Sequence, residues 1–220
     1  MRITSLILCL PLMLASCSHL PEIRPAENVA ADRDAQCRAI FPTGRWQLVH
    51  SIEMLPPAGS KQTVMGVVQL SSEKRTFHCV LMTIEGLVLF EADFNGAVTI
   101  ERALPPLDMP GMADGIARDI SLIFLAPEEP CAEAGFLKDG GWVCRHPSAD
   151  GGDEDIVVQP DGRWEIGCYD KNRRLTRSVA PLAKEDVHAG GWPSRVMLKA
   201  YGLGGYELRM SLIEADYLGK

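Results

Sequence analysis

The hydrophobic pattern has a period of two along most of the chain, the spacing of a β-strand with one buried face. Glycine and proline clusters, and one Asn-Gly pair at 95–96, separate the alternating segments into short strands. In the first half these segments follow one another directly, which predicts consecutive antiparallel strands. They cover residues 45–54, 62–70, 75–84, 87–94 and 97–103.

Short alternating segments return in the second half, where pairs of glycines separate several of them. The last segment is the clearest, because Tyr206, Leu208 and Met210 alternate with polar residues. The predicted strands here are 142–146, 155–159, 163–169, 175–179, 194–201 and 206–215.

Two segments have helical spacing instead. The first covers 26–41 and ends at Pro42, and the second follows Asp114, which we expect to cap it, and ends before Pro127. The predicted fold class is therefore mainly β with α. We expect a strongly curved antiparallel sheet, an incomplete barrel of about 10–11 strands, lidded by two short helices.

A proline-rich loop at 104–112 interrupts the strands before the second helix, and it carries large apolar side chains. Together with the helix and one strand residue, this loop could form an apolar binding site or its lid, for which flexible methionines are well suited. A filled core built from the same side chains is the alternative, and the sequence leaves both open. The residues concerned are Leu104, Leu107, Met109, Met112, Ile116, Ile120, Phe124 and Phe90.

The N-terminus has the features of a secretory signal, with Arg2 before a short apolar run that ends in small residues. The segment Leu14-Ala15-Ser16-Cys17 resembles the lipobox of bacterial lipoproteins, so we expect cleavage after 1–16 and lipid attachment at Cys17. Two or three acyl chains anchor a protein durably to a membrane. Because Ser18, rather than aspartate, follows the cysteine, the resemblance implies the outer membrane, with the protein facing the periplasm.

Composition supports one compact domain after this anchor. The 220 residues are 46% hydrophobic and 23% charged, which argues against disorder. We expect a lipidated cysteine and flexible tether at 17–28 and a single domain at 29–220. An excess of 29 acidic over 22 basic residues, with 6% aromatics, argues against nucleic acid as a partner. The expected partner is the membrane, reached through the N-terminal lipid.

Catalytic and metal-binding motifs are absent from the sequence, so we expect no enzymatic activity, no cofactor and no metal. The histidines are scattered and lack ligand spacing, at positions 19, 50, 78, 146 and 188. An acidic stretch at 150–155 could ligate calcium, but it lacks the EF-hand order and is more typical of a solvated turn.

Five cysteines follow Cys17, at positions 37, 79, 131, 144 and 168, so at least one remains a free thiol. An oxidising compartment permits disulfides. The glycine-rich stretch between Cys131 and Cys144 favours this pair, since it could fold back as a hairpin. Buried free cysteines that pack as small apolar residues are the alternative.

Three segments of the chain resemble a family of small bacterial lipoproteins whose fold is similar to that of LolB, the outer-membrane lipoprotein receptor. They are 41–52, 85–90 and 205–212. The resemblance implies a LolA/LolB-like half-barrel whose concave face holds acyl chains or a lipidated partner, without chemistry. A structural or assembly accessory that docks an envelope complex, with a filled core and no ligand, is the alternative function.

Overall fold

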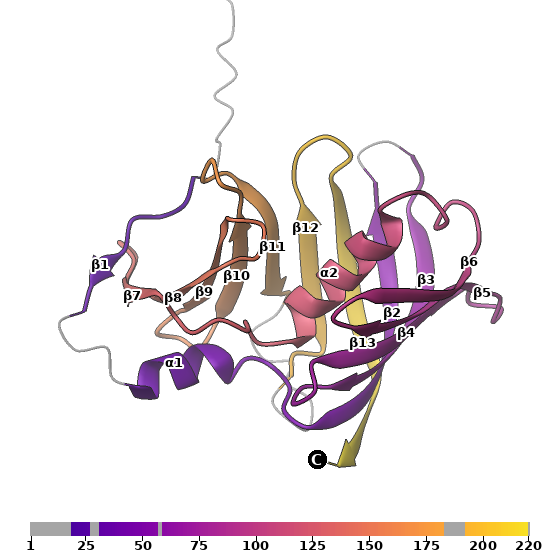
Figure 1. Ribbon diagram of the computed structural model, residues 1–220, viewed down its shortest axis with the longest axis horizontal. Coiled ribbons are helices and arrows are strands. Elements are labelled where there is room, and N and C mark those ends of the chain that lie inside the picture. The colour runs from indigo at the N-terminus through magenta and orange to yellow at the C-terminus, as the bar shows by residue number, and fades with distance from the viewer. Residues whose placement is uncertain (1–18, 27–30, 57–58, 183–191, 220) are drawn as a thin grey trace, which may run out of the picture.

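The computed structural model describes residues 19–26, 31–56, 59–182 and 192–219 (Figure 1). In this part of the chain, two short helices accompany one antiparallel sheet of 13 strands. The helices are α1 (Ala31–Arg38) and α2 (Met112–Phe124). The strands are β1 (Arg24–Pro25), β2 (Arg45–Leu55), β3 (Gln62–Ser71), β4 (Thr76–Met82), β5 (Val88–Asn95), β6 (Val98–Ala103), β7 (Glu133–Phe136), β8 (Trp142–Pro147), β9 (Asp153–Val158), β10 (Trp164–Tyr169), β11 (Leu175–Pro181), β12 (Arg195–Ala200) and β13 (Tyr206–Gly219).

Two meanders build the sheet, one from β2 to β6 and the other from β7 to β13. They join where β13 pairs with β2, with Met210 opposite Ile52 and Leu208 opposite Met54. The sheet begins at β1 and ends at β6, and no pairing joins these two edges among the described residues. The result is the curved, unclosed sheet that the sequence predicted, and the five-strand meander of the first half is confirmed.

The strand count is higher than the predicted 10–11 because two strands were missed. β1 has two residues and β7 has four, too few for a period of two to be recognised. They pair with each other through Pro25 and Gly135. An added Cβ at Gly135 would lie 2.1 Å from the carbonyl oxygen of Arg24, so this approach of two backbones requires glycine.

The prediction of a flexible tether at 17–28 is wrong for the residues that the structure describes. His19 forms a β-bridge with Arg174, and the amide of Leu20 donates to the carbonyl of Arg173 at 3.0 Å. Further along, β1 extends the sheet, so the ordered domain begins before residue 29. Backbone pairing of this kind has no signature in composition. The predicted signal peptide, 1–16, and lipidated Cys17 lie outside the described residues.

Both predicted helices are present, with different ends. Within the described residues, α1 is confined to Ala31–Arg38. Helix α2 begins at Met112 after Gly111, whose φ of 78° is in the left-handed region that glycine tolerates best. No side chain caps α2, so the prediction that Asp114 does so is wrong. Asp114 lies instead in the first turn, where its charge is favourable to the helix dipole.

Candidate functional site

The concave face of the sheet is mainly apolar and is covered by helices. Residues that are paired across neighbouring strands lie on the same face of a sheet. Helix α2 crosses one face (Figure 1), and the buried residues of the central strands lie on that face. They include Leu48, Ile52, Val68, Leu70, Phe77, Cys79, Phe90, Ala92, Ile156, Ile166, Val179, Val196, Leu198, Met210 and Leu212. The sheet curves around α2, which therefore occupies the concavity.

Helix α2 fills this concavity with its apolar side. Phe124 is 1% exposed and packs between the rings of His50 and Trp192, at centroid distances of 5.6 and 5.4 Å. Ile120 and Ile123 are buried beside it. In this state the concave face is a packed core rather than an open groove.

The predicted binding or lid residues divide into a buried and a peripheral set. Phe90, Ile120 and Phe124 are buried in the core, whereas Leu107 and Ile116 are half-buried against it. The rest belong to the loop or to its junction with α2: Leu104 and Met112 are half-buried, and Met109 is exposed. The structure thus brings the helix residues into the concavity and leaves the loop at its margin.

A polar clamp, formed by Asp119, Arg177 and Tyr206, holds α2 in place. Asp119 lies on the buried side of the helix, where its carboxylate accepts a 2.7 Å hydrogen bond from Nε of Arg177 and another from the hydroxyl of Tyr206. Burial raises the pKa of Asp119, and both partners oppose this shift. Buried charges of this kind are costly unless they are paired. The clamp therefore favours one seating of α2 over others.

The sequence did not predict the clamp. Asp119 lies within the apolar stripe of the predicted helix, next to Ile120, and this position could have indicated a buried polar contact. An acidic residue on an otherwise buried helix side needs a partner. Its partners on β11 and β13 are 58 and 87 positions away, so the sequence could not identify them.

A row of polar side chains crosses the concave face, and its members differ in their partners. His146, Glu154 and Cys168 are cross-strand neighbours on β8, β9 and β10, and Arg177 continues the row on β11. Arg177 is bound to the clamp. For Glu154, by contrast, burial raises the pKa to about 7. This carboxyl group is therefore near the midpoint of its titration at neutral pH.

This row does not have the properties of a nucleophilic site. Burial raises the pKa of Cys168 well above that of an ordinary thiol, and the thiolate is the reactive form. Nδ1 of His146 is 2.9 Å from the carbonyl of Glu129, which orients the ring without a substrate. His50 is also buried, and desolvation lowers its pKa to about 4, so it packs as a neutral ring. His146 and His50 therefore have the surroundings of histidines with a structural role. His188 lies outside the described residues.

The cysteine pairing differs from the prediction. A disulfide joins Cys37 of α1 to Cys144 of β8, 107 positions apart, and Cys131 is a free thiol together with Cys79 and Cys168. The expected Cys131–Cys144 bond is therefore wrong as to partner. The helix containing Cys37 packs on β8 and β9, a long-range contact that loop length could not indicate.

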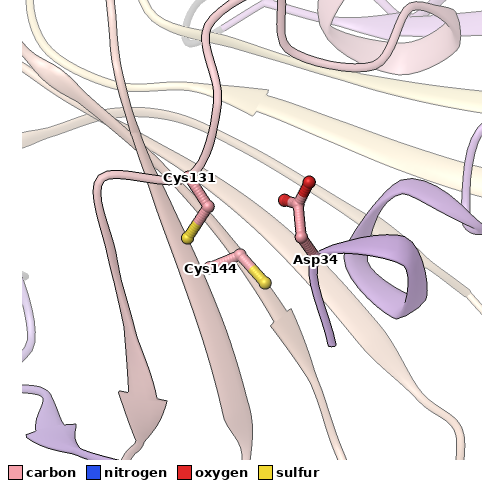
Figure 2. A group of neighbouring side chains, drawn as sticks. All are labelled: Asp34, Cys131 and Cys144. Atoms are coloured by element: carbon pink, nitrogen blue, oxygen red, sulfur yellow. The ribbon is translucent and has the colours of Figure 1, made fainter. Parts of the chain in front are cut away.

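Cys131 nevertheless lies beside this disulfide. Its Sγ, the Sγ of Cys144 and a carboxylate oxygen of Asp34 all lie within 4.8 Å of one another (Figure 2). Because Cys144 is in a disulfide, it does not offer a thiolate to a metal in this state.

The acidic stretch 150–155 is divided between a turn, where Asp150 accepts from the amide of Gly152, and β9, where Asp155 pairs with Arg145 at 2.7 Å.

We call the upper rim the end of the sheet at which residues 83–87, 104–111, 170–174 and 201–205 connect the strands. Because the strands are antiparallel, the turns after β4, β10 and β12 lie at this same end, together with the loop after β6. Its exposed apolar side chains include Leu203, fully exposed, and Ile84, 70% exposed. His19 and Leu20 lie against this rim through their contacts with residues 173–174.

A small pocket of about 210 Å³ opens beside α2. The β5–β6 hairpin and one side of α2 line it, through Phe94, Val98, Ala117 and Ser121 among others. This volume is below the 300–1,000 Å³ that is typical of ligand pockets. Space for a larger apolar ligand would have to come from movement of α2.

Comparison with solved structures shows the fold. The chain is similar to a LolA-superfamily protein from Nitrosomonas europaea, with 12% identity, a TM-score of 0.50, and coverage of 86% of this chain and 93% of that one. It is also similar to a DUF1329 family protein from Desulfovibrio piger, with 8% identity, a TM-score of 0.53, and coverage of 85% and 91%. Neither protein-family models nor curated protein sequences give a match. The LolA-like fold expected from the sequence is thus confirmed.

Neither described helix has the length and apolar character that a membrane crossing requires.

Glu154 gives a prediction about pH. The folded state keeps a proton on this carboxyl up to pH 7, whereas the unfolded chain releases it near 4.5, so the contribution of Glu154 to stability falls as pH rises between these values. Relative to wild type, we expect the free energy of unfolding of Glu154→Gln to increase by about 2 kcal/mol as the pH rises from 5 to 8. Urea unfolding of both proteins at each pH measures this difference, and parallel pH profiles would contradict it.

Proposed function

We propose that this protein is a lipid-binding lipoprotein of the bacterial envelope, which takes acyl chains into its concave face when α2 moves aside. The observation that carries the proposal is the seating of one amphipathic helix in the apolar concavity of an unclosed sheet. The sheet encloses the helix on one side only, so α2 can leave without breaking strand pairing. The LolA-like fold is compatible with this role and supports the architecture alone.

The energetics permit an exchange of helix for lipid. Burial of an acyl chain contributes about 0.8 kcal/mol per methylene, or roughly 12 kcal/mol for a chain of about 16 carbons. This free energy offsets the loss of the contacts that Ile120, Ile123 and Phe124 make with the sheet. The clamp sets an additional cost, because Asp119 and Arg177 separate when the helix leaves. Binding is then a passive competition, with no chemical step.

Membrane attachment completes the proposal. Lipid on Cys17 would hold the protein in the outer membrane, and residue 17 is two positions before His19 at the upper rim. The rim would therefore face the bilayer. Its exposed Lys171, Arg173 and Arg174 can bind anionic lipid head groups. Its exposed apolar side chains can enter the membrane interface beneath the head groups. This orientation corresponds to a LolB-like carrier or receptor at the outer membrane.

Lipid binding is tested on the purified protein and on a clamp variant. We expect organic extraction and mass spectrometry to find phospholipid or fatty acid, and a fluorescent fatty acid to bind the delipidated protein. Tyr206→Phe removes one bond to Asp119, so α2 opens more often and the apparent Kd falls roughly 5- to 10-fold.

Tyr217→Phe is the matched control. It makes the same change in the same strand, where Tyr217 packs on Trp46 at 5.0 Å instead of holding α2. Its Kd should equal that of wild type. Absence of extracted lipid together with no probe binding in any of these proteins would reject the carrier function and leave the accessory lipoprotein with a filled core.

Membrane contact at the upper rim is tested with the mature chain carrying Ser in place of Cys17, so that no lipid anchor contributes. We expect weak binding to vesicles that contain phosphatidylglycerol, and Leu203→Glu combined with Ile84→Glu should reduce it at least 5-fold. Ile213→Glu is the control, because Ile213 is 54% exposed but lies within β13, away from the rim. Equal losses from the rim and control variants in vesicle sedimentation would argue against this orientation.

A further inference from the structure

We propose that Cys131 exchanges with the Cys37–Cys144 disulfide, so that the bond tying α1 to the sheet alternates with a bond between Cys131 and Cys144. Figure 2 shows the side chains of Cys131 and Cys144 adjacent to one another, with Asp34 of α1 beside them. The proposal concerns the cysteines alone and does not depend on lipid binding.

The position of Cys131 is fixed next to the bond that it attacks. The amide of Ala132 donates to the carbonyl of Arg145 at 2.8 Å, which holds the segment before β7 against β8. The Sγ atoms of Cys131 and Cys144 lie within 4.8 Å, so a small side-chain movement brings them into contact. Cys131 is half-buried and not enclosed, unlike Cys79.

The chemical step is balanced within the protein. Cys131 loses its proton to solvent, and its thiolate attacks Sγ of Cys144. A new Cys131–Cys144 bond forms as the Cys37–Cys144 bond breaks, and Cys37 leaves as a thiolate that takes up a proton. The number of disulfides is unchanged, so no external oxidant or reductant is required.

The surroundings of Cys131 oppose the reaction in the resting state. Burial and the carboxylate of Asp34 raise the pKa of Cys131, whereas a backbone hydrogen bond at Arg145 and the charge of Arg38 lower it. The thiol also donates to the carbonyl of Glu133 at 3.2 Å. Asp34 therefore acts as a brake on exchange. Loss of its charge should increase the thiolate fraction and the rate.

Exchange changes how α1 is attached. After it, α1 keeps noncovalent contacts only, including the hydrogen bond from Nη1 of Arg38 to the carbonyl of Pro127 at 2.9 Å. Because α1 packs on β8 and β9, its release would expose that end of the concave face. The device is thus a covalent latch with two positions.

Disulfide mapping distinguishes the two bonds, because trypsin separates all three cysteines. Cys37 lies in the peptide 34–38, Cys131 in 119–138 and Cys144 in 139–145. The full chain is incubated in a glutathione redox buffer, quenched with acid, alkylated under denaturing conditions and digested without reduction. We expect the 34–38/139–145 pair to predominate and a 119–138/139–145 pair to appear, and its initial rate of appearance should be at least 3-fold higher in Asp34→Asn.

Variants provide the decisive comparison. Cys37→Ser should form the Cys131–Cys144 bond, whereas Cys37→Ser/Cys131→Ser should leave Cys144 alkylated, and Cys37→Ser/Cys168→Ser should behave like Cys37→Ser. If Cys37→Ser fails to fold, the wild-type mapping still decides. Failure to detect the 119–138/139–145 pair in wild type and Asp34→Asn, or pairing of Cys144 with Cys79 or Cys168, would overturn the proposal.

Discussion

An unclosed, curved sheet leaves an apolar concave face that must be shielded from water, and this constraint determines the arrangement of the other elements. Helix α2 meets it by placing Ile120, Ile123 and Phe124 against the sheet. Helix α1 covers the β8–β9 end, where a disulfide attaches it. Neither helix takes part in the strand ladder, so the backbone pairing of the sheet does not depend on their position.

Two attachments of different kinds hold the helices. The Asp119–Arg177–Tyr206 clamp on α2 is electrostatic, and its strength comes from pairing charges that burial would otherwise penalise. The attachment of α1 is covalent and lies next to a third sulfur. The concave face is thus closed at one place by a noncovalent contact and at another by a covalent bond that has a free thiol beside it.

The sequence was sufficient to predict the curved meander and its two helices, because alternation in segments such as 206–215 is a local signal. It failed where the determinant is not local. The strands β1 and β7 are too short to show a period, and the register that joins β13 to β2 spans most of the chain. The same limit applies to the site. Apolar spacing was enough to predict that Phe90, Ile120 and Phe124 are apolar positions facing the interior, and they are buried, but the partner of Cys144 and the partners of Asp119 depend on contacts between distant segments.

Measurement of the position of α2 with and without lipid shows whether the helix leaves the concave face when lipid binds. Spin labels at Arg118→Cys on α2 and Arg209→Cys on β13, in the mature chain with Cys17, Cys79, Cys131 and Cys168 replaced by serine, give the helix-to-sheet distance by pulsed electron resonance. A pair on the sheet alone, Glu101→Cys and Arg209→Cys, is the reference. If α2 moves aside for lipid, phospholipid will lengthen and broaden the first distance and leave the second unchanged. An unchanged helix-to-sheet distance in protein that has bound lipid would contradict it.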